Sequence, residues 1–217
     1  PLMTLPKTGG PGSLLPVDYD HDGDVDLLVS TSQGLRLLRN DGLEGTGSFF
    51  DATAEASLPA GEFRVISEDF DRDNDVDFLL LPVVGGAPKL LSNERRGRFS
   101  DASTTLPAGL AGRWIVVADF DGDSWVDLAV IDSDIALHTR NELGGWRAEV
   151  KRLPLARPPT GAPIAADWDL DGTFDLLWPC AEAPAAALFA PAFEAGGLEQ
   201  LLGEPFSAPV AGPSLLE

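Results

Sequence analysis

A nine-residue segment rich in aspartate occurs four times in this 217-residue chain, and no other feature constrains the fold as strongly. The copies, which we call loops 1 to 4, begin 51, 50 and 48 residues apart. They occupy residues 18–26 (Asp-Tyr-Asp-His-Asp-Gly-Asp-Val-Asp), 69–77 (Asp-Phe-Asp-Arg-Asp-Asn-Asp-Val-Asp), 119–127 (Asp-Phe-Asp-Gly-Asp-Ser-Trp-Val-Asp) and 167–175 (Asp-Trp-Asp-Leu-Asp-Gly-Thr-Phe-Asp). A fixed period of this length is typical of stacked copies of one supersecondary unit. We therefore expect four equivalent units.

The sequence between the loops predicts short strands. Each loop is followed by an apolar run of strand length, at 27–29, 78–81, 128–131 and 176–178, and further short apolar segments alternate with Gly, Pro and Asn turns. About four strands per repeat is the content of one propeller blade. The prediction is an all-β chain, a single β-propeller or propeller segment of four-stranded repeats with approximate boundaries 1–61, 62–109, 110–160 and 161–217. Residues 185–190 fit a helix or a strand equally well.

The negative charge is concentrated in the loops. The formal net charge is −20, and the four loops hold 18 aspartates and one arginine, so they carry −17 of it. This argues against a nucleic-acid partner, whose phosphates the loops would repel. One cysteine, Cys180, excludes an internal disulfide, and no apolar stretch approaches the roughly 20 residues of a membrane-spanning helix.

The loops have the composition of calcium sites. Ca²⁺ takes six to eight oxygen ligands in flexible geometry, and a loop coiled around the ion can offer the side chains of positions 1, 3, 5 and 9 and the carbonyl of position 7. All sixteen of these side chains are aspartates, and without a cation they would repel one another. We predict up to four Ca²⁺ ions. The predicted ligands are Asp18, Asp20, Asp22, the Asp24 carbonyl and Asp26; Asp69, Asp71, Asp73, the Asp75 carbonyl and Asp77; Asp119, Asp121, Asp123, the Trp125 carbonyl and Asp127; and Asp167, Asp169, Asp171, the Thr173 carbonyl and Asp175.

Other metal sites fit less well. Zinc favours imidazole and thiolate, whereas the loops contain only His21, and magnesium demands strict octahedral geometry. An EF-hand needs a glutamate at position 12 and an exiting helix, but position 12 is Val29, Leu80, Val130 or Trp178. Position 6 should turn with positive φ, which suits Gly23, Gly172 and Asn74 better than Ser124. We expect the third site to be the weakest or most distorted, unless Gly122 shifts the turn.

Several other residues carry expectations of their own. The aromatic residue at position 2 of each loop is predicted to pack between blades, with stacking on a sugar as the alternative; these residues are Tyr19, Phe70, Phe120 and Trp168. The tryptophans at 114, 125, 146 and 178 are predicted to be core residues rather than binding platforms, with Trp125 the best candidate for exposure because it lies in a loop. Arg95, Arg96 and Arg98 are predicted to form a solvated hairpin tip or, alternatively, to contact an anionic partner. Cys180 is predicted to be a buried small hydrophobe.

These motifs resemble a known family. The loops look like the Asp-x-Asp-x-Asp-Gly-x-x-Asp motifs of FG-GAP (VCBS-type) repeats, as in integrin α-subunit propellers and cartilage-acidic-protein-like bacterial proteins, and the phrases at 37–42 and 50–56 resemble the latter group. The resemblance covers about residues 14–180. It implies a propeller with calcium loops on one rim, in secreted or cell-surface proteins that bind other molecules. Such propellers usually have around seven blades, so we favour a segment of a larger propeller over a closed four-blade ring.

The functional expectation is a non-enzymatic, calcium-binding adhesion or binding module, extracellular or secreted, including periplasmic or cell-surface placement. Its partner would be a protein or carbohydrate. No Gly-x-Ser-x-Gly or His-Glu-x-x-His motif is present, and the paired carboxylates lie in the loops. The alternatives are a calcium-dependent lectin, or the non-catalytic part of a polysaccharide-acting enzyme whose active site lies on other blades.

Overall fold

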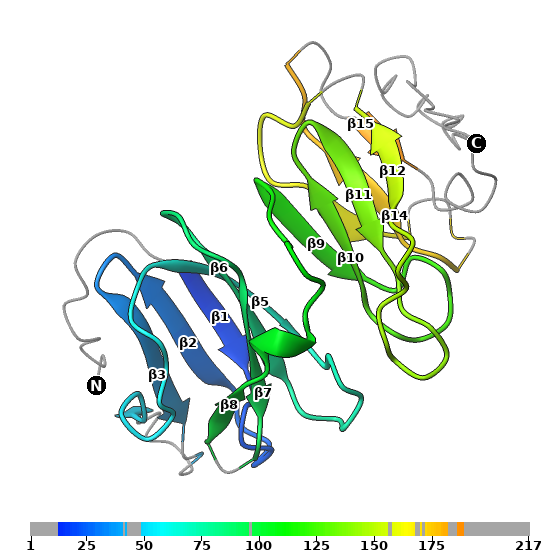
Figure 1. Ribbon diagram of the computed structural model, residues 1–217. Coiled ribbons are helices and arrows are strands. Elements are labelled where there is room, and N and C mark those ends of the chain that lie inside the picture. Colours follow the sequence, from blue (N-terminus) through cyan, green and yellow to red (C-terminus); the bar gives the residue numbers. More distant parts are fainter. Residues whose placement is uncertain are drawn as a thin grey trace, which may run out of the picture. The chain divides into compact units, whose positions relative to one another are not determined.

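The computed structural model describes residues 13–40, 42, 49–95, 97–155, 158–167, 170, 172–181 and 186–188, which are almost entirely β-structure (Figure 1). Two compact units, residues 1–111 and 112–217, divide the chain. In the first unit, blade 1 contains β1 (Ser13–Val17), β2 (Asp26–Thr31), β3 (Gly34–Asn40) and β4 (Phe49–Asp51). Blade 2 contains β5 (Phe63–Glu68), β6 (Asp77–Pro82), β7 (Lys89–Asn93) and β8 (Phe99–Asp101), followed by the 3₁₀ helix η1 (Ser103–Thr105).

The second unit repeats this pattern. Blade 3 contains β9 (Trp114–Ala118), β10 (Asp127–Ile131), β11 (Asp134–His138) and β12 (Lys151–Pro154). Blade 4 contains β13 (Ile164–Ala166), β14 (Asp175–Trp178) and β15 (Ala186–Leu188). Strand neighbours follow chain order and pair antiparallel, as hairpin connections require. The all-β, blade-like prediction is thereby confirmed, with three strands rather than four in the described part of blade 4. The ambiguous stretch near residue 186 is a strand.

The register places every aspartate loop at the same point of its blade. The ninth loop residue opens the second strand and pairs with the residue just before the loop, as in Val17↔Asp26, Glu68↔Asp77 and Ala118↔Asp127. Each loop is therefore the connection between the first two strands of a blade, closed at its base by the antiparallel ladder. The second strands are almost completely buried, which explains their unbroken apolar runs.

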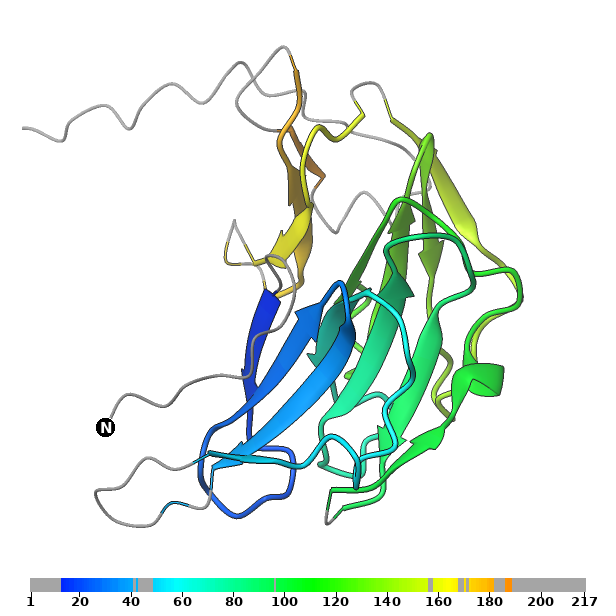
Figure 2. The ribbon, with the colours of Figure 1, turned by 90° about the vertical axis from the view of Figure 1, so that its left-hand side faces the viewer.

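A core lies between the two sheets of each unit. In the first unit, the sheets of blades 1 and 2 lie side by side (Figure 2). Tyr19 and Leu37 of blade 1 pack with Phe78 and Leu80 of blade 2. The Ser30 hydroxyl of β2 also donates a hydrogen bond to the Phe63 carbonyl of β5. This arrangement fixes loops 1 and 2 at neighbouring positions within the unit.

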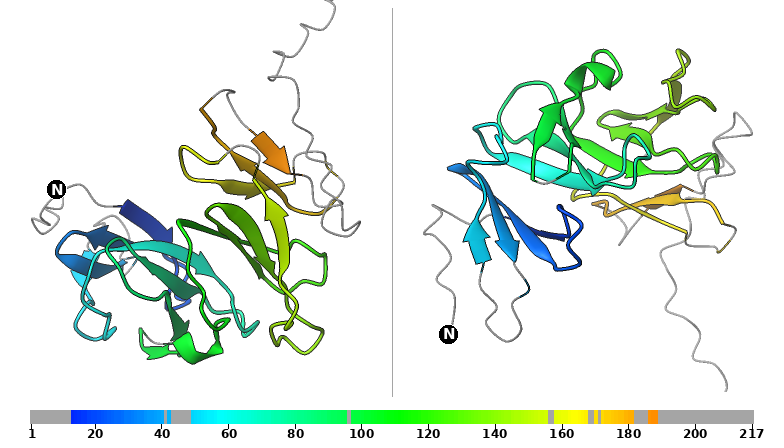
Figure 3. Two further views of the ribbon diagram at one scale, coloured as in Figure 1. Left: turned by 45° about the horizontal axis from the view of Figure 1, so that its top comes forward. Right: turned by 90° about the horizontal axis from the view of Figure 1, so that it is seen from below.

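In the second unit, the sheets of blades 3 and 4 lie side by side (Figure 3). The corresponding core packs Phe120 and Leu137 of blade 3 with Leu176 and Trp178 of blade 4. Cys180 is buried in this core, as predicted. The inter-blade packing predicted for the position-2 aromatics is confirmed for Tyr19 and Phe120. Phe70 is also buried, and Trp168 lies outside the described residues. None of the helical segments among the described residues is long and apolar enough to cross a membrane.

Candidate metal centre

The carboxylate at position 1 organises each loop by accepting hydrogen bonds from the backbone that curls around it. The position-6 N–H donates to this carboxylate in all four loops: Gly23 to Asp18 (3.2 Å), Asn74 to Asp69 (3.0 Å), Ser124 to Asp119 (2.8 Å) and Gly172 to Asp167 (3.2 Å). In the first three loops the position-7 N–H donates in the same way to the position-5 carboxylate, at 2.8 to 2.9 Å. These bonds hold both carboxylates against the inside of the coil.

Two residues in each loop, not one, have left-handed backbone conformation. Positive φ occurs at position 6, as predicted, and also at position 4, where the residues are His21, Arg72, Gly122 and Leu170. The sequence did not reveal the second turn because two of those residues, Arg72 and Leu170, are not typical of positive φ. Ser124 adopts φ 69°, close to the 67° of Asn74, and the third loop keeps the same hydrogen bonds as the second. The expected distortion of loop 3 is absent, and its weaker affinity stays a prediction.

The position-9 carboxylate is buried and bonded on both oxygens. Asp26, Asp77 and Asp127 are at most 1% exposed. One oxygen accepts the position-2 N–H, from Tyr19, Phe70 or Phe120, at 2.9 to 3.3 Å. The other accepts the N–H of the residue at or just beyond the end of the third strand: Asn40 at 2.7 Å, Asn93 at 2.8 Å and Arg140 at 3.0 Å. Position 9 thus ties each loop to the rest of its blade.

Those three strand-end residues also hold the loop through their side chains, a role that the sequence did not reveal. Asn40 donates to the Val25 carbonyl (3.2 Å), Asn93 to the Val76 carbonyl (3.3 Å) and Arg140, through Nε, to the Val126 carbonyl (3.2 Å). In blade 3 the hydrogen bonds show that Arg140, one residue before Asn141, takes the place of the two asparagines.

Three of the four predicted carboxylates converge in each of the first three loops. One oxygen from every member of a group lies within 4.8 Å of the others; the groups are Asp18, Asp20 and Asp22; Asp69, Asp71 and Asp77; and Asp119, Asp121 and Asp127. Asp26, Asp73 and Asp123, the remaining predicted side-chain ligands of these loops, are not in these groups. The position-7 carbonyls of Asp24, Asp75 and Trp125 stay predicted ligands.

Loops 1 and 3 each contain aspartate oxygens that are buried without a hydrogen bond. These are Oδ1 of Asp18 and of Asp20 in loop 1, and Oδ1 of Asp121 and Oδ2 of Asp123 in loop 3. Burying a carboxylate oxygen without a partner is strongly unfavourable, and a hard divalent cation bound by oxygen ligands would satisfy it. The donor set therefore fits calcium in these two loops, and loop 2 has the same backbone.

The pKa values of these carboxyls also show that their ionised forms are disfavoured without a cation. Burial raises the pKa of Asp20, Asp71 and Asp121, and the neighbouring position-5 carboxylate of the same loop raises it further. Burial also raises the pKa of Asp26 and of Asp77 to about 6, although two backbone N–H groups lower each value. For Asp127 burial and then the charge of Asp121 raise the pKa to about 7. A bound cation would reverse these shifts by favouring the ionised forms.

Loop 4 is described in part. Asp175 is buried, Thr173 and Asp167 are described, and Asp167 accepts the Gly172 N–H. The predicted ligands Asp169 and Asp171 lie outside the described residues.

Arg95 is exposed at a hairpin tip, as predicted, with 61% of its side chain accessible, and it also pairs with position 7 of loop 2. The carboxylate of Asp75 is buried and pairs with Arg95, whose Nη2 also donates to the Asp73 carbonyl at 3.1 Å. On its other side Asp75 lies 3.1 Å from Nδ1 of His21. Arg95 is therefore part of the loop structure. Arg96 lies outside the described residues.

Position 7 of loop 3 is Trp125, which packs against other side chains, as predicted for the tryptophans of this chain. Trp125 is half-buried, and the guanidinium of the buried Arg140 lies 5.4 Å from the centre of its ring and 4.2 Å from that of Trp146. A Cβ added to Gly144 would lie 2.6 Å from the Trp125 ring, so the 141–145 turn covers this side chain. Trp125 is consequently a packing residue and not an open platform.

A model of the FG-GAP-like repeat matches residues 18–80 and 69–130, which together span more than half of the chain. The chain belongs to the FG-GAP-like repeat family. Both matches begin at the first aspartate of a loop, so the loops belong to the repeat itself. No curated protein sequence matches this FG-GAP-like protein at a significant level.

Among solved structures, the FG-GAP-like chain is similar to a lectin from Agrocybe aegerita whose structure explains its specific recognition of non-reducing terminal N-acetylglucosamine. The TM-score is 0.55 at 15% sequence identity. The similarity covers 82% of this chain and 49% of the lectin, so the chain spans about half the length of that protein. At this identity the similarity supports the fold alone.

Proposed function

We propose that the chain is a non-enzymatic binding module of the secreted or cell-surface type, whose blades are stabilised by calcium in the aspartate loops. The observation that carries this proposal is the set of buried carboxylate oxygens without hydrogen bonds in loops 1 and 3. A loop that holds such oxygens at neutral pH needs a cation to be stable. Binding modules commonly use loops at one end of a rigid β-scaffold, which is how these blades present theirs.

Calcium would act on this protein by mass action. A ligand that binds only the native state stabilises it by RT ln(1 + [L]/Kd). With Kd values of about 10⁻⁴ to 10⁻³ M, as in extracellular modules, the sites would fill outside cells and empty in a calcium-poor cytosol. The extracellular placement in this proposal follows from that concentration difference.

The decisive experiment is thermal unfolding of the full chain in millimolar calcium, in excess EGTA, and in EGTA with magnesium. We expect chelation to lower Tm by about 4–20 °C, since at about 1 mM calcium the two loops of a unit would contribute about 1–3 kcal/mol and 1 kcal/mol shifts Tm by about 4–8 °C in a unit of this size. Magnesium should restore little of the loss. Equal melting temperatures in calcium and in EGTA would refute the proposal.

A second candidate is carbohydrate binding, favoured by the structural similarity to a lectin. A glycan array that includes terminal N-acetylglucosamine, probed in calcium and again in EGTA, tests it. Calcium-dependent binding of a defined glycan would support the lectin function. An array with no bound glycan would leave a protein partner as the better candidate.

A further inference from the structure

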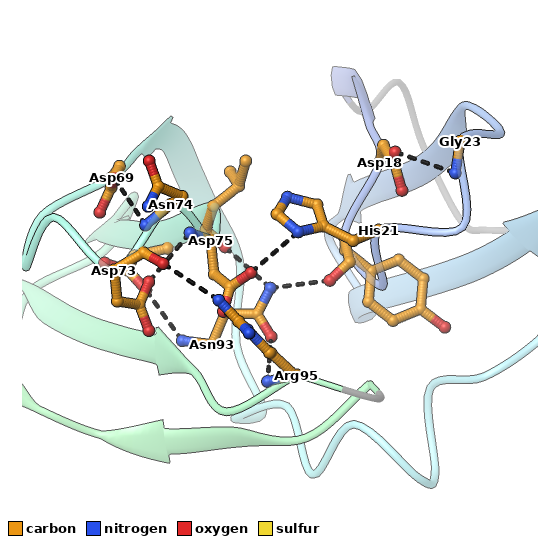
Figure 4. Close-up of polar contacts among 12 residues, drawn as sticks. Asp18, His21, Gly23, Asp69, Asp73, Asn74, Asp75, Asn93 and Arg95 are labelled. Carbon is orange, nitrogen blue, oxygen red and sulfur yellow. Dashed lines mark hydrogen bonds and ion pairs between the residues drawn. The ribbon is translucent and has the colours of Figure 1, made fainter.

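Loops 1 and 2 are joined by a continuous set of hydrogen bonds centred on Asn93 (Figure 4). The Asn93 side chain donates to the Tyr19 carbonyl of loop 1 at 2.7 Å and to the Val76 carbonyl of loop 2 at 3.3 Å. Its backbone N–H donates to Asp77 of loop 2 at 2.8 Å, while the Tyr19 N–H donates to Asp26 of loop 1 at 3.3 Å. The position-9 carboxylates of the two loops are thus linked through two residues.

A second connection runs beside the first. Nδ1 of His21 lies 3.1 Å from Oδ1 of Asp75 (Figure 4). His21 stands between the predicted ligands Asp20 and Asp22, and Asp75 is the position-7 residue of loop 2. The carboxylate of Asp75 is 2% exposed and also pairs with Arg95, so the His21 contact reaches a buried group of loop 2. A change in the conformation of loop 1 on binding an ion would therefore alter the position of Asp75, whose carbonyl is a predicted ligand of loop 2.

We propose that loops 1 and 2 bind calcium cooperatively, with Asn93 and the His21–Asp75 contact as the coupling residues. This inference rests on the proposed calcium binding. An ion in loop 1 fixes Tyr19 and His21, which orders Asn93 and Asp75 and so reduces the ordering that loop 2 must undergo. Coupling between sites is reciprocal, so loop 2 favours binding in loop 1 by the same factor.

Electrostatics acts in the opposite direction, because the first ion reduces the negative potential that attracts the second. This term is screened over a Debye length of about 8 Å at physiological salt, whereas buried hydrogen bonds are screened much less. We therefore expect net positive coupling of about fivefold to tenfold in affinity at that ionic strength, within the usual range for coupled sites.

The test is a calcium titration of the ¹⁵N-labelled full chain followed at two amides. The Gly23 and Asn74 N–H groups donate to the first aspartate of loops 1 and 2, so each reports its own site. Disabling loop 1 with Asp20→Asn and Asp22→Asn should weaken calcium binding at Asn74 about fivefold or more. Disabling loop 2 with Asp71→Asn and Asp73→Asn should weaken binding at Gly23 by the same factor. Unchanged affinity of the intact loop would overturn the proposal.

The bridging residues are tested against a matched control. In Asn93→Ala the affinity of loop 2 should no longer depend on loop 1. Asn40→Ala removes the equivalent bond to Val25 in blade 1, a residue with no contact to a second loop within the described part of the chain, and should keep the dependence. If Asn93→Ala fails to fold, His21→Ala decides, since this side chain is 47% exposed and its removal is compatible with folding. Undiminished coupling in His21→Ala would then refute the route.

The failure of this inference is distinguishable from that of the proposed function. If neither amide responds to calcium, the proposed calcium binding itself is wrong. If both amides respond with affinities that do not depend on the other loop, only the coupling is wrong.

Discussion

Loops 2 and 3 reach one backbone conformation with different side chains. Both turn with positive φ at positions 4 and 6, and both hold the position-9 carboxylate between two N–H groups. Loop 2 covers a buried aspartate at position 7 with Arg95, whereas loop 3 covers a tryptophan there with Arg140. The comparison indicates that the aspartates at positions 1 and 9 determine the backbone conformation of the loop. Position 7 can vary if an arginine near the end of the third strand contacts its side chain.

The largest effect should come from removing the shared position-9 carboxylate. Asp77→Ala and Asp127→Ala each leave two buried backbone N–H groups without acceptors, at about 1–3 kcal/mol per group. We expect each variant to lose about 3 kcal/mol of unfolding free energy in calcium, measured by chemical denaturation. A loss of unfolding free energy in one variant and none in the other would show that the position-9 carboxylates of loops 2 and 3 are not equivalent.

The second test compares the loops through pH. Below pH 3.8 these carboxyls are protonated in both the folded and unfolded states, but between pH 4 and their raised pKa values the folded state holds protons that the unfolded chain has released. Stability of the calcium-free protein should therefore fall as pH rises through about 6 for Asp77 and about 7 for Asp127, by several degrees in Tm. With calcium saturating, stability should instead rise with pH. A calcium-free Tm that increases between pH 4 and 7 contradicts the sign.

The third test exchanges the strand-end residues. Arg140→Asn makes loop 3 resemble loop 2, because asparagine can still reach the Val126 carbonyl but cannot stack on Trp125 and Trp146. Loss of these cation–π contacts and of the bond to the Gly144 carbonyl should reduce stability by about 1–2 kcal/mol. The reciprocal Asn93→Arg has no tryptophan to stack on and should not stabilise. Equal melting temperatures of Arg140→Asn and the parent protein would show that the stacking of Arg140 on the two tryptophans contributes nothing to stability.

The smallest effect concerns the turn at position 6. Ser124 holds a positive φ that glycine adopts without strain, so Ser124→Gly should stabilise loop 3 by about 0.5–1 kcal/mol. Asn74→Gly should gain less, because asparagine tolerates this conformation. Differential scanning calorimetry in saturating calcium can resolve the two. A larger gain at Asn74 would invert the ranking.

The repeated features of the fold could be predicted from the sequence, whereas the contacts between residues on different strand connections could not. The loops, the second strands and the inter-blade aromatics followed from side-chain type and period. The roles of Asn40, Asn93 and Arg140 did not, because each bonds a loop 13 to 16 residues away through a backbone N–H that any non-proline residue carries. The left-handed backbone at position 4 was not predicted either, since residues such as Arg72 and Leu170 rarely adopt positive φ. The pairing of Arg95 with Asp75 and the contact of Arg140 with Trp125 were not predicted, because each partner lies on another strand connection.

The hydrogen bond from Asn40 to Asp26 has a consequence for the order in which the loops are completed during folding. Loop 1 is finished only when a residue 14 positions downstream has emerged and paired, and its carbonyl at Tyr19 waits for Asn93, 74 positions downstream. A synthetic nonapeptide copied from residues 18–26 would therefore be a poor mimic of the proposed ion site. As the chain folds, the proposed sites would be completed hairpin by hairpin, so calcium binding would report how much of each blade has formed.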